Sequence, residues 1–163
     1  MAIHPVRRYP DPVLRKVAAK VADISADLLV HARDMVETMH AARGIGLAAN
    51  QIGISLRIIT LDVGPEKESA PLVLINPEIV ESAFEETAEE GCLSLPGFYE
   101  TVKRARQVKV KAGTLEGKEF NMECEGLLAR AFQHEIDHLN GLLLVDRLSP
   151  VKRQLFRKEY MKE

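Results

Sequence analysis

Hydrophobic residues recur at helical spacing in two long segments of the chain. After Ser25, a good helix N-cap, apolar residues follow every three or four positions up to Gly44. This pattern predicts a first helix of about 18 residues. A second helix is expected from about Gly126 to Asn140-Gly141, a pair typical of a helix C-terminus. The apolar positions of the first helix are Leu28, Ala32, Met35 and Met39.

Other segments have the short apolar runs or the alternation that predict strands. Val108 and Val110 alternate with lysines, which is typical of a half-buried strand, and a turn leads from there to a return strand. The segment Leu95-Pro96-Gly97 is expected to end any strand that precedes it. The predicted strands span residues 56–63, 72–75 and 102–111, with the return strand around Phe120 and Met122.

The order of these elements predicts the fold class. A third helix, rich in basic residues, is expected after Ser149-Pro150, with Ser149 as its cap. Because the strands cluster between helices and do not alternate with them, we expect an α+β fold. In this fold, antiparallel strands pack around a central helix, the one that ends near Asn140, between an N-terminal and a C-terminal helix. The length of 163 residues suits a single domain, residues 1–163.

The composition limits which binding partners and which cellular compartment we expect for the protein. The formal net charge is −2, which gives no global electrostatic reason to expect DNA as a partner. No apolar stretch approaches the ~20 residues that span a bilayer, so no membrane insertion is expected. The first residues lack the apolar core of a signal peptide, and two cysteines make no disulfide framework. We therefore expect a cytoplasmic protein.

Charge is distributed unevenly along the chain. Residues 78–90 contain six acidic residues and no basic one, whereas residues 147–163 contain six bases against two acids. Either run is compatible with an ordinary solvated face. The basic run is alternatively a docking surface for an anionic partner.

The run His134-Glu135-Ile136-Asp137-His138 carries the strongest chemical signal. Two histidines four positions apart on a helix project from one face, so both imidazoles reach a single metal ion. Glu135 lies beside that face, where a carboxylate can handle the proton of a metal-bound water. A cation there lowers the pKa of water towards ~7 and polarises a carbonyl, which is hydrolytic chemistry. The motif is short, so an amphipathic helix with two incidental histidines is the alternative.

A catalytic metal of this kind needs a third protein ligand and one open position. Cys92 is the best candidate, because the glycine in Glu90-Gly91-Cys92-Leu93-Ser94 permits close approach of the backbone. Cys124 stands between two glutamates, which disfavour a thiolate, and we expect a half-exposed strand residue there. His31 and His40 fall in the first helix, where packing and the helix dipole account for them.

A second constellation, Gly44-Ile45-Gly46-Leu47-Ala48-Ala49-Asn50-Gln51, follows the first helix. Its alternating glycines leave an open backbone that can lie against a substrate as a strand would. Gln51 offers a neutral amide suited to hydrogen-bonding a developing oxyanion. The segment is no phosphate loop, because it lacks the Lys-Ser/Thr pair and follows a helix.

Three segments together, residues 44–51, 90–94 and 133–138, resemble the signature motifs of the peptide deformylase family in order and spacing. The opening Tyr9-Pro10-Asp11-Pro12-Val13-Leu14-Arg15 resembles the usual start of that family. These enzymes remove the formyl group from the N-terminal formylmethionine of nascent polypeptides and release formate. The resemblance therefore implies a metal-dependent hydrolase of a linear amide, with formylmethionyl peptides as its substrates.

The resemblance also implies roles for individual residues. Metal-bound hydroxide attacks the formyl carbon with Glu135 as general acid/base, while Gln51 and the backbone N–H of Leu93 hold the oxyanion. The implied cofactor is one divalent ion, usually Fe²⁺ in this family; Zn²⁺, Ni²⁺ or Co²⁺ are alternatives, because imidazole and thiolate suit both zinc and iron. The implied metal ligands are Cys92, His134 and His138, and the residues implied to hydrogen-bond the peptide are Ile45, Gly46 and Gly91.

Helical spacing predicts where the methionine side chain binds. Leu127 and Ala131 lie seven and three residues before His134, on the same helical face, and we expect them to wall an apolar pocket. The stem of Arg130 borders that face and contributes to it. Some family members carry an arginine after the second motif to meet the substrate backbone, where this chain has Tyr99. The residue that meets the peptide beyond methionine is therefore left open.

Two rival functions share parts of this pattern. A small zincin-like metalloprotease also has His-Glu-x-x-His, but it would normally use His or Glu in place of Cys92 and needs a second lobe to hold a long peptide. A metal-stabilised binding module predicts the loss of Glu135 or a fourth protein ligand, and the sequence has neither feature. The basic C-terminal helix suits docking on ribosomal RNA near the polypeptide exit.

Overall fold

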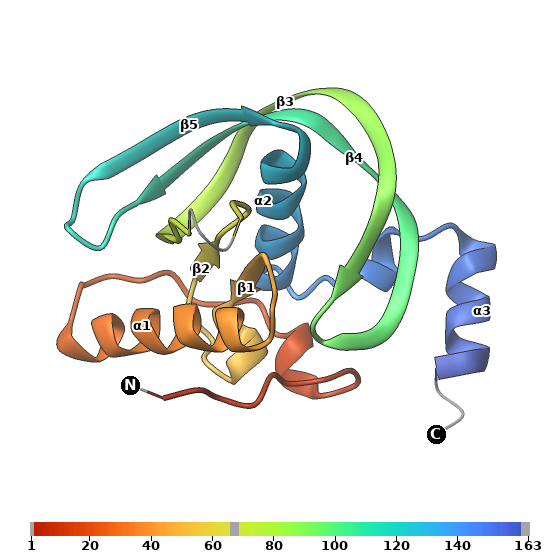
Figure 1. The fold of residues 1–163 in the computed structure, drawn as a ribbon, viewed down its shortest axis with the longest axis horizontal. Helices are drawn as coiled ribbons and strands as arrows, with labels where there is room; N and C mark the ends of the chain where they lie inside the picture. Colours follow the sequence, from red (N-terminus) through yellow and green to blue (C-terminus); the bar gives the residue numbers. More distant parts are fainter. Residues whose placement is uncertain (1, 66–68, 161–163) are drawn as a thin grey trace.

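A single antiparallel sheet wraps around a central helix in the computed structural model, which describes residues 2–65 and 69–160. The strand order is β1-β2-β3-β4-β5, so each strand pairs with its neighbours in the sequence. The two longest strands, β3 and β4, form a hairpin that curves around α2 (Figure 1). The strands are β1 (Gly46–Ala48), β2 (Ile58–Leu61), β3 (Leu72–Cys92), β4 (Leu95–Gly113) and β5 (Glu119–Glu125).

Three α-helices accompany the sheet, as expected for the α+β class. Ser25 caps α1, its Oγ accepting the N–H of Leu28 at 3.1 Å, and Pro150 opens α3. None of the helices in the described part of the chain is long and apolar enough to cross a membrane. The helices are α1 (Ala26–Ala41), α2 (Gly126–Leu139) and α3 (Pro150–Tyr160), and the short 3-10 turns are η1 (Pro12–Arg15), η2 (Ala49–Ile52) and η4 (Leu144–Arg147).

The main core lies between α2 and the concave face of the sheet. Phe132 of α2 is fully buried against apolar residues of β2, β3 and β4. Replacement of such a side chain by alanine typically costs ~3–5 kcal/mol. A second cluster, centred on Met35 and Met39, packs α1 against Leu47 of β1 and Ile58 of β2. The two clusters fix β1 and η2 between α1 and α2.

The C-terminal helix is attached through aromatic rings. The ring of Phe156 lies 5.5 Å from that of Tyr9 and 4.9 Å from that of Phe98, both edge-to-face. Tyr160 stacks on Phe156 at 4.9 Å. Because Phe98 belongs to β4, α3 joins the N-terminal segment to the tip of the long hairpin.

The extent of β3 and β4 differs from the sequence prediction. Residues 72–75 are only the start of β3, which continues through the acidic run to Cys92. Three register shifts, together with left-handed backbone at Asn76 and Phe84, break the alternation there, and most side chains of that stretch are exposed. The preceding strand β3 ends at Cys92, before residues 95–97, but those residues are themselves the start of β4, whereas the prediction began that strand at residue 102. This ribbon is formed by backbone hydrogen bonds between the two strands. Such pairing is not visible in the pattern of polar and apolar side chains.

Candidate active site

The helix α2 presents its two histidines to the same point. His134 and His138 are separated by one helical turn, and their Nε2 atoms lie 3.3 Å apart. Burial and the neighbouring charges of His134 and Arg104 lower the pKa of His138 well below its usual value, which favours the neutral imidazole that binds metals. The carbonyl of His138 accepts a hydrogen bond from Asn50 at 2.6 Å, which fixes the end of α2 to η2.

The hairpin of β3 and β4 supplies the third donor atom. Cys92 is the last residue of β3, and its Sγ lies 3.3 Å from Nε2 of His138. The donor atoms of Cys92, His134 and His138 all lie within 4.8 Å of one another. Two imidazole nitrogens bound to one ion at ~2.0–2.1 Å in tetrahedral geometry would be about 3.4 Å apart, close to the observed spacing. This donor set fits a divalent metal with one position left for water or substrate.

The second cysteine and two other histidines, His40 and His4, are held elsewhere. Cys124 is a half-buried residue of β5, as expected, and burial raises the pKa of its thiol. His40 pairs with Asp62 at 2.9 Å. His4 pairs with Asp34 at 2.8 Å. None of these three contributes to the cluster of Cys92 and the α2 histidines.

Glu135 is buried beside the metal ligands. Burial raises the pKa of its carboxyl to about 7, although the charges of His134 and Arg104 act in the opposite direction. Its Oε1 has no hydrogen-bond partner among the described residues. Its other oxygen lies against the backbone of Gly46, where an added Cβ would come within 2.5 Å. A carboxyl group in this setting can gain or lose a proton near neutral pH, next to the strand edge of β1.

Gln51 is oriented by three contacts. Its Oε1 accepts the backbone N–H of Ala48 at 2.9 Å, and its Nε2 donates to Ser94 Oγ at 3.0 Å. The same Nε2 lies 3.8 Å from Sγ of Cys92. The side-chain amide is thus fixed with its donor side towards the metal-ligand cluster. Leu93 directly follows Cys92 in the tight turn of the hairpin.

One pocket of about 500 Å³ unites these residues. Leu127, Arg130 and Ala131 form part of its wall. The guanidinium of Arg130 is engaged in hydrogen bonds, since it donates to Glu90 and to the carbonyls of Val102 and Glu86. The predicted site residues that line the pocket are Ile45, Gly46, Gln51, Gly91, Cys92, Leu93, Leu127, Arg130, Ala131, His134 and Glu135.

The family model of polypeptide deformylase matches residues 3–154 of this chain. The chain belongs to the peptide deformylase family. The peptide deformylase of Thermodesulfovibrio yellowstonii is 52% identical over 161 residues, which cover 98% of each chain. The crystal structure of a peptide deformylase from Legionella pneumophila is 50% identical, with a TM-score of 0.92, and the match covers 99% of this chain and 95% of that one. A peptide deformylase from Ehrlichia chaffeensis in complex with actinonin is 35% identical, with a TM-score of 0.88 and coverage of 98% and 99%.

This match makes the chain a deformylase by sequence and by structure over nearly its whole length. Its reaction is the hydrolytic removal of the formyl group from N-terminal formylmethionine. The candidate metal site of Cys92, His134 and His138 is consistent with that metal-dependent chemistry. The zincin-like protease, which shares only the short histidine motif, is therefore not the family of this chain.

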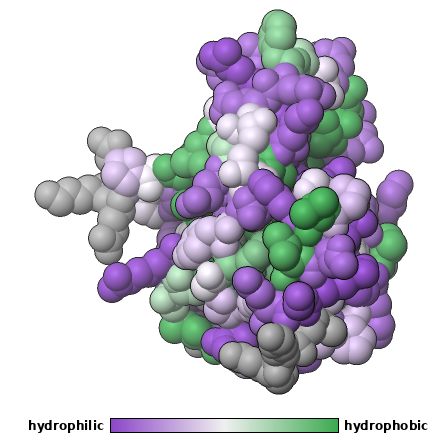
Figure 2. Space-filling view, turned by 90° about the vertical axis from the view of Figure 1, so that its right-hand side faces the viewer, coloured by the Kyte–Doolittle hydropathy of each residue, from purple (hydrophilic) through white to green (hydrophobic). Residues whose placement is uncertain are grey.

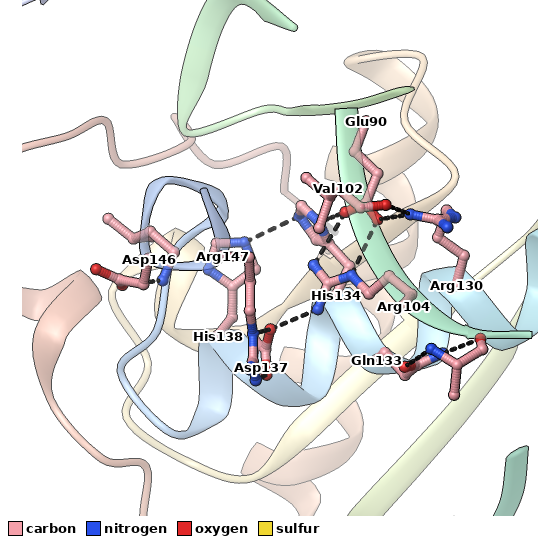
Figure 3. Close-up of polar contacts among 12 residues, drawn as sticks. Glu90, Val102, Arg104, Arg130, Gln133, His134, Asp137, His138, Asp146 and Arg147 are labelled. Carbon is pink, nitrogen blue, oxygen red and sulfur yellow. Dashed lines mark hydrogen bonds and ion pairs between the residues drawn. The ribbon is translucent and has the colours of Figure 1, made fainter. Parts of the chain in front are cut away.

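A buried ionic network behind the deformylase site was absent from the sequence prediction (Figure 3). Glu90 accepts from both His134 and Arg104, at 3.0 Å and 2.9 Å. Arg104 also donates to Asp137 at 2.6 Å, and Asp137 in turn receives two hydrogen bonds from Arg147. Burial raises the pKa of Glu90, but the hydrogen bonds from His134 and Arg104 outweigh it and lower the pKa to about 2.

One signal in the sequence could have revealed this network. Arg104 falls on the same parity as the buried Val102, Val108 and Val110, which makes it a candidate for burial, although Arg106 has the same parity and is exposed. A buried arginine requires charged partners, and Glu90 and Asp137 are its partners here. Their identity depends on the curvature of the hairpin around α2, which the alternation does not encode.

Proposed function

We propose that Cys92, His134 and His138 bind a divalent metal ion, most favourably Fe²⁺, at which the formyl amide of formylmethionyl peptides is hydrolysed. The observation that carries this proposal is the convergence of the three donor atoms beside the buried carboxyl of Glu135. When bound, the ion lowers the pKa of a water molecule and polarises the formyl carbonyl. Fe²⁺ is favoured by the resemblance to the family, and Zn²⁺, Ni²⁺ and Co²⁺ suit the same ligands.

Glu135 is the proposed general acid/base. A base is most effective when its pKa lies near the working pH, and burial brings the pKa of Glu135 to about 7. The carboxylate removes a proton from the attacking water and later returns it to the amine of methionine, so that formate leaves. Its position against Gly46 places it beside any peptide that lies along β1.

The oxyanion is proposed to be held by Gln51 and the backbone N–H of Leu93. Each preorganised donor of this kind is typically worth about 2.7–4 kcal/mol of transition-state stabilisation. Gln51 has two amide hydrogens, and only one is needed for the hydrogen bond to Ser94. The hydrogen bond to Ser94 therefore orients the amide of Gln51 and leaves its second hydrogen for the oxyanion.

The peptide is proposed to bind as an added strand. β1 is the edge strand of the sheet, and one of its sides is already paired with β2, where the backbone N–H of Asp62 donates to the carbonyl of Ile45 at 2.8 Å. The opposite edge, along Ile45 and Gly46, is thereby available to an extended peptide, with Gly91 on its other side. The methionine side chain then lies against Leu127, Ala131 and the stem of Arg130.

Formate release from formyl-Met-Ala-Ser tests this mechanism. Glu135→Gln should lower kcat by about 10²–10⁴-fold, because the proton transfers lose their carrier. The variant should keep its metal, measured after anaerobic purification, which would also identify the ion. Wild-type rates in the variant would remove Glu135 from the mechanism. Cleavage of internal bonds in unformylated peptides would favour a protease, and a metal-loaded protein without any hydrolysis would favour a binding module.

We also propose that the protein acts in the cytoplasm as one catalytic domain, and that α3 docks on ribosomal RNA. Arg157 and Lys158 are exposed on α3, and hydrophilic surface covers most of the face that carries this helix (Figure 2). Lys162 and Glu163 of the basic run lie outside the described residues. Deletion of residues 150–163 would also remove Phe156 from the core, so charge reversal is the cleaner test. Arg157→Glu with Lys158→Glu should reduce co-sedimentation with ribosomes, and undiminished co-sedimentation would contradict docking.

A further inference from the structure

Arg43 adopts a backbone conformation that usually belongs to glycine. Its φ is 57°, in the left-handed region. Beyond the C-cap Ala42 of α1, Gly44 donates to the carbonyl of Met39 and Arg43 donates to that of His40, both at 3.0 Å. These two bonds define a Schellman motif, in which the left-handed position is most often glycine. A non-glycine residue there costs backbone free energy.

No side-chain hydrogen bond among the described residues offsets the left-handed backbone of Arg43. Asn76, which shares the left-handed conformation, offsets it with two side-chain hydrogen bonds to the backbone of Val21. The Arg43 guanidinium has no hydrogen bond or ion pair with any described residue, and the side chain is exposed. A cation near a helix C-terminus interacts favourably with the helix dipole, and this is the structural alternative. A strained residue that the fold does not need is a candidate for a functional role.

The position of Arg43 relative to the pocket indicates that role. Arg43 lines the active-site pocket and also a neighbouring hollow of about 660 Å³, bordered by His40, Gly44 and Ile45. Among the described charged residues that line the active-site pocket, Arg43 and Glu89 are exposed, whereas Glu90, Arg130, His134 and Glu135 are buried. The mouth of the pocket therefore carries one free positive charge and one free negative charge.

A peptide that reaches the metal site must leave through this mouth. With its formyl group at the metal ligands and its backbone along Ile45 and Gly46, its following residues pass the exposed rim. We propose that Arg43 is a specificity residue, which pairs with an acidic side chain at the second or third position of the formylated peptide. This inference rests on the proposed function of the site. Glu89 has the opposite sign and favours basic side chains at the same positions.

Two sets of peptides test the inference, formyl-Met-X-Ala and formyl-Met-Ala-X, where X is Glu, Ser or Lys and each peptide is a C-terminal amide. Within a set, Arg43→Gly should lower the ratio of kcat/KM for the acidic peptide to that for the basic one by up to roughly fivefold, the upper end of the range for an exposed ion pair. The loss should lie in KM and weaken in concentrated salt. Glu89→Gln should move the ratio in the opposite direction.

Stability separates this role from a structural one. Arg43→Gly relieves the left-handed strain, so its Tm should equal or exceed that of the wild type while discrimination falls. Arg33→Gln, which removes an exposed cation on α1 outside the pocket, controls for total charge and should leave the ratio unchanged. Equal changes with all three peptides of each set, or a lower Tm with an unchanged ratio, would overturn the role of Arg43 alone. Absence of formate release by the wild type from every peptide would overturn the proposed function and this inference together.

Discussion

The carboxylate of Glu90 lies 3.0 Å from Nδ1 of His134, while Nε2 of that histidine faces His138. A carboxylate at one imidazole nitrogen keeps the proton there and leaves the lone pair of the other nitrogen for the metal. Glu90 also forms ion pairs with the guanidinium groups of Arg104 and Arg130. One buried carboxylate thus orients a proposed metal ligand and neutralises two arginines.

Glu90→Gln should weaken both metal binding and folding. Loss of such a partner typically costs 10–100-fold in metal affinity, and an uncompensated buried charge costs about 3–5 kcal/mol. Chelator competition measures the first effect and urea unfolding of the metal-free protein measures the second. Glu89→Gln, which changes the exposed neighbouring glutamate, should weaken neither metal binding nor folding. Equal behaviour of the two variants would mean that the network is dispensable.

Gly141→Ala should destabilise the fold strongly. Gly141 has a φ of 76°, and an added Cβ would lie 2.5 Å from the backbone oxygen of Arg15, which cannot move aside as a side chain can. We expect a loss of about 2–4 kcal/mol in the free energy of unfolding. Gly117→Ala is the matched control, because Gly117 has a φ of 80° but only an ordinary contact at 3.8 Å. Similar losses in the free energy of unfolding for both variants would show that the left-handed backbone, and not a clash of the added Cβ, causes the destabilisation.

Leu127→Lys should raise KM for formyl-Met peptides. Leu127 is 54% exposed at the pocket wall, so a charge is tolerated by the fold but opposes the burial of methionine. About 1–2 kcal/mol of lost apolar contact corresponds to roughly a fivefold to thirtyfold rise. Leu29→Lys, at a leucine 44% exposed on α1, should leave KM unchanged. An unchanged KM in Leu127→Lys would contradict the methionine pocket.

The contribution of Asp34 to stability should depend on pH. Hydrogen bonds from His4 and from the backbone N–H of Ala2 lower the pKa of Asp34. A carboxyl whose pKa is lower in the folded chain stabilises the fold above its unfolded pKa, about 3.9, and loses that contribution as the pH falls through the folded pKa. Asp34→Asn should therefore be less stable than wild type above about pH 5, with a gap that shrinks below about pH 4 in urea unfolding. The exposed Asp23→Asn should show no such gap, and a gap that does not vary with pH would contradict the linkage.

Local patterns were enough to predict the helices and half of the site. The spacing of His134 and His138 needs only the helical repeat, and Ser25 and Gly141 marked helix ends that the structure has. The α+β arrangement followed from the order of elements, because consecutive strands of an antiparallel sheet need only short connections.

The remainder depends on contacts between distant segments. Cys92 was named as the third ligand from its motif, but its approach to His138, 46 positions away, depends on the turn of the long hairpin. The part of β3 after Ile75 was missed because exposed charges, the register shifts between Ile75 and Glu81, and the left-handed backbone at Asn76 and Phe84 hide its period of two. Glu90 looked like one of six solvated acids, yet the fold buries it against Arg104. Burial of a charge is decided by its partners, which a linear pattern does not specify.

The position of β1 at the end of the sheet has a further consequence for the behaviour of the protein at high concentration. An open strand edge is a template on which a second chain can add, which is a common start of aggregation. β1 is only three residues long and is fully buried, so it offers few backbone groups and little room. The same brevity that limits this edge to one narrow peptide also protects the protein from pairing with its own copies.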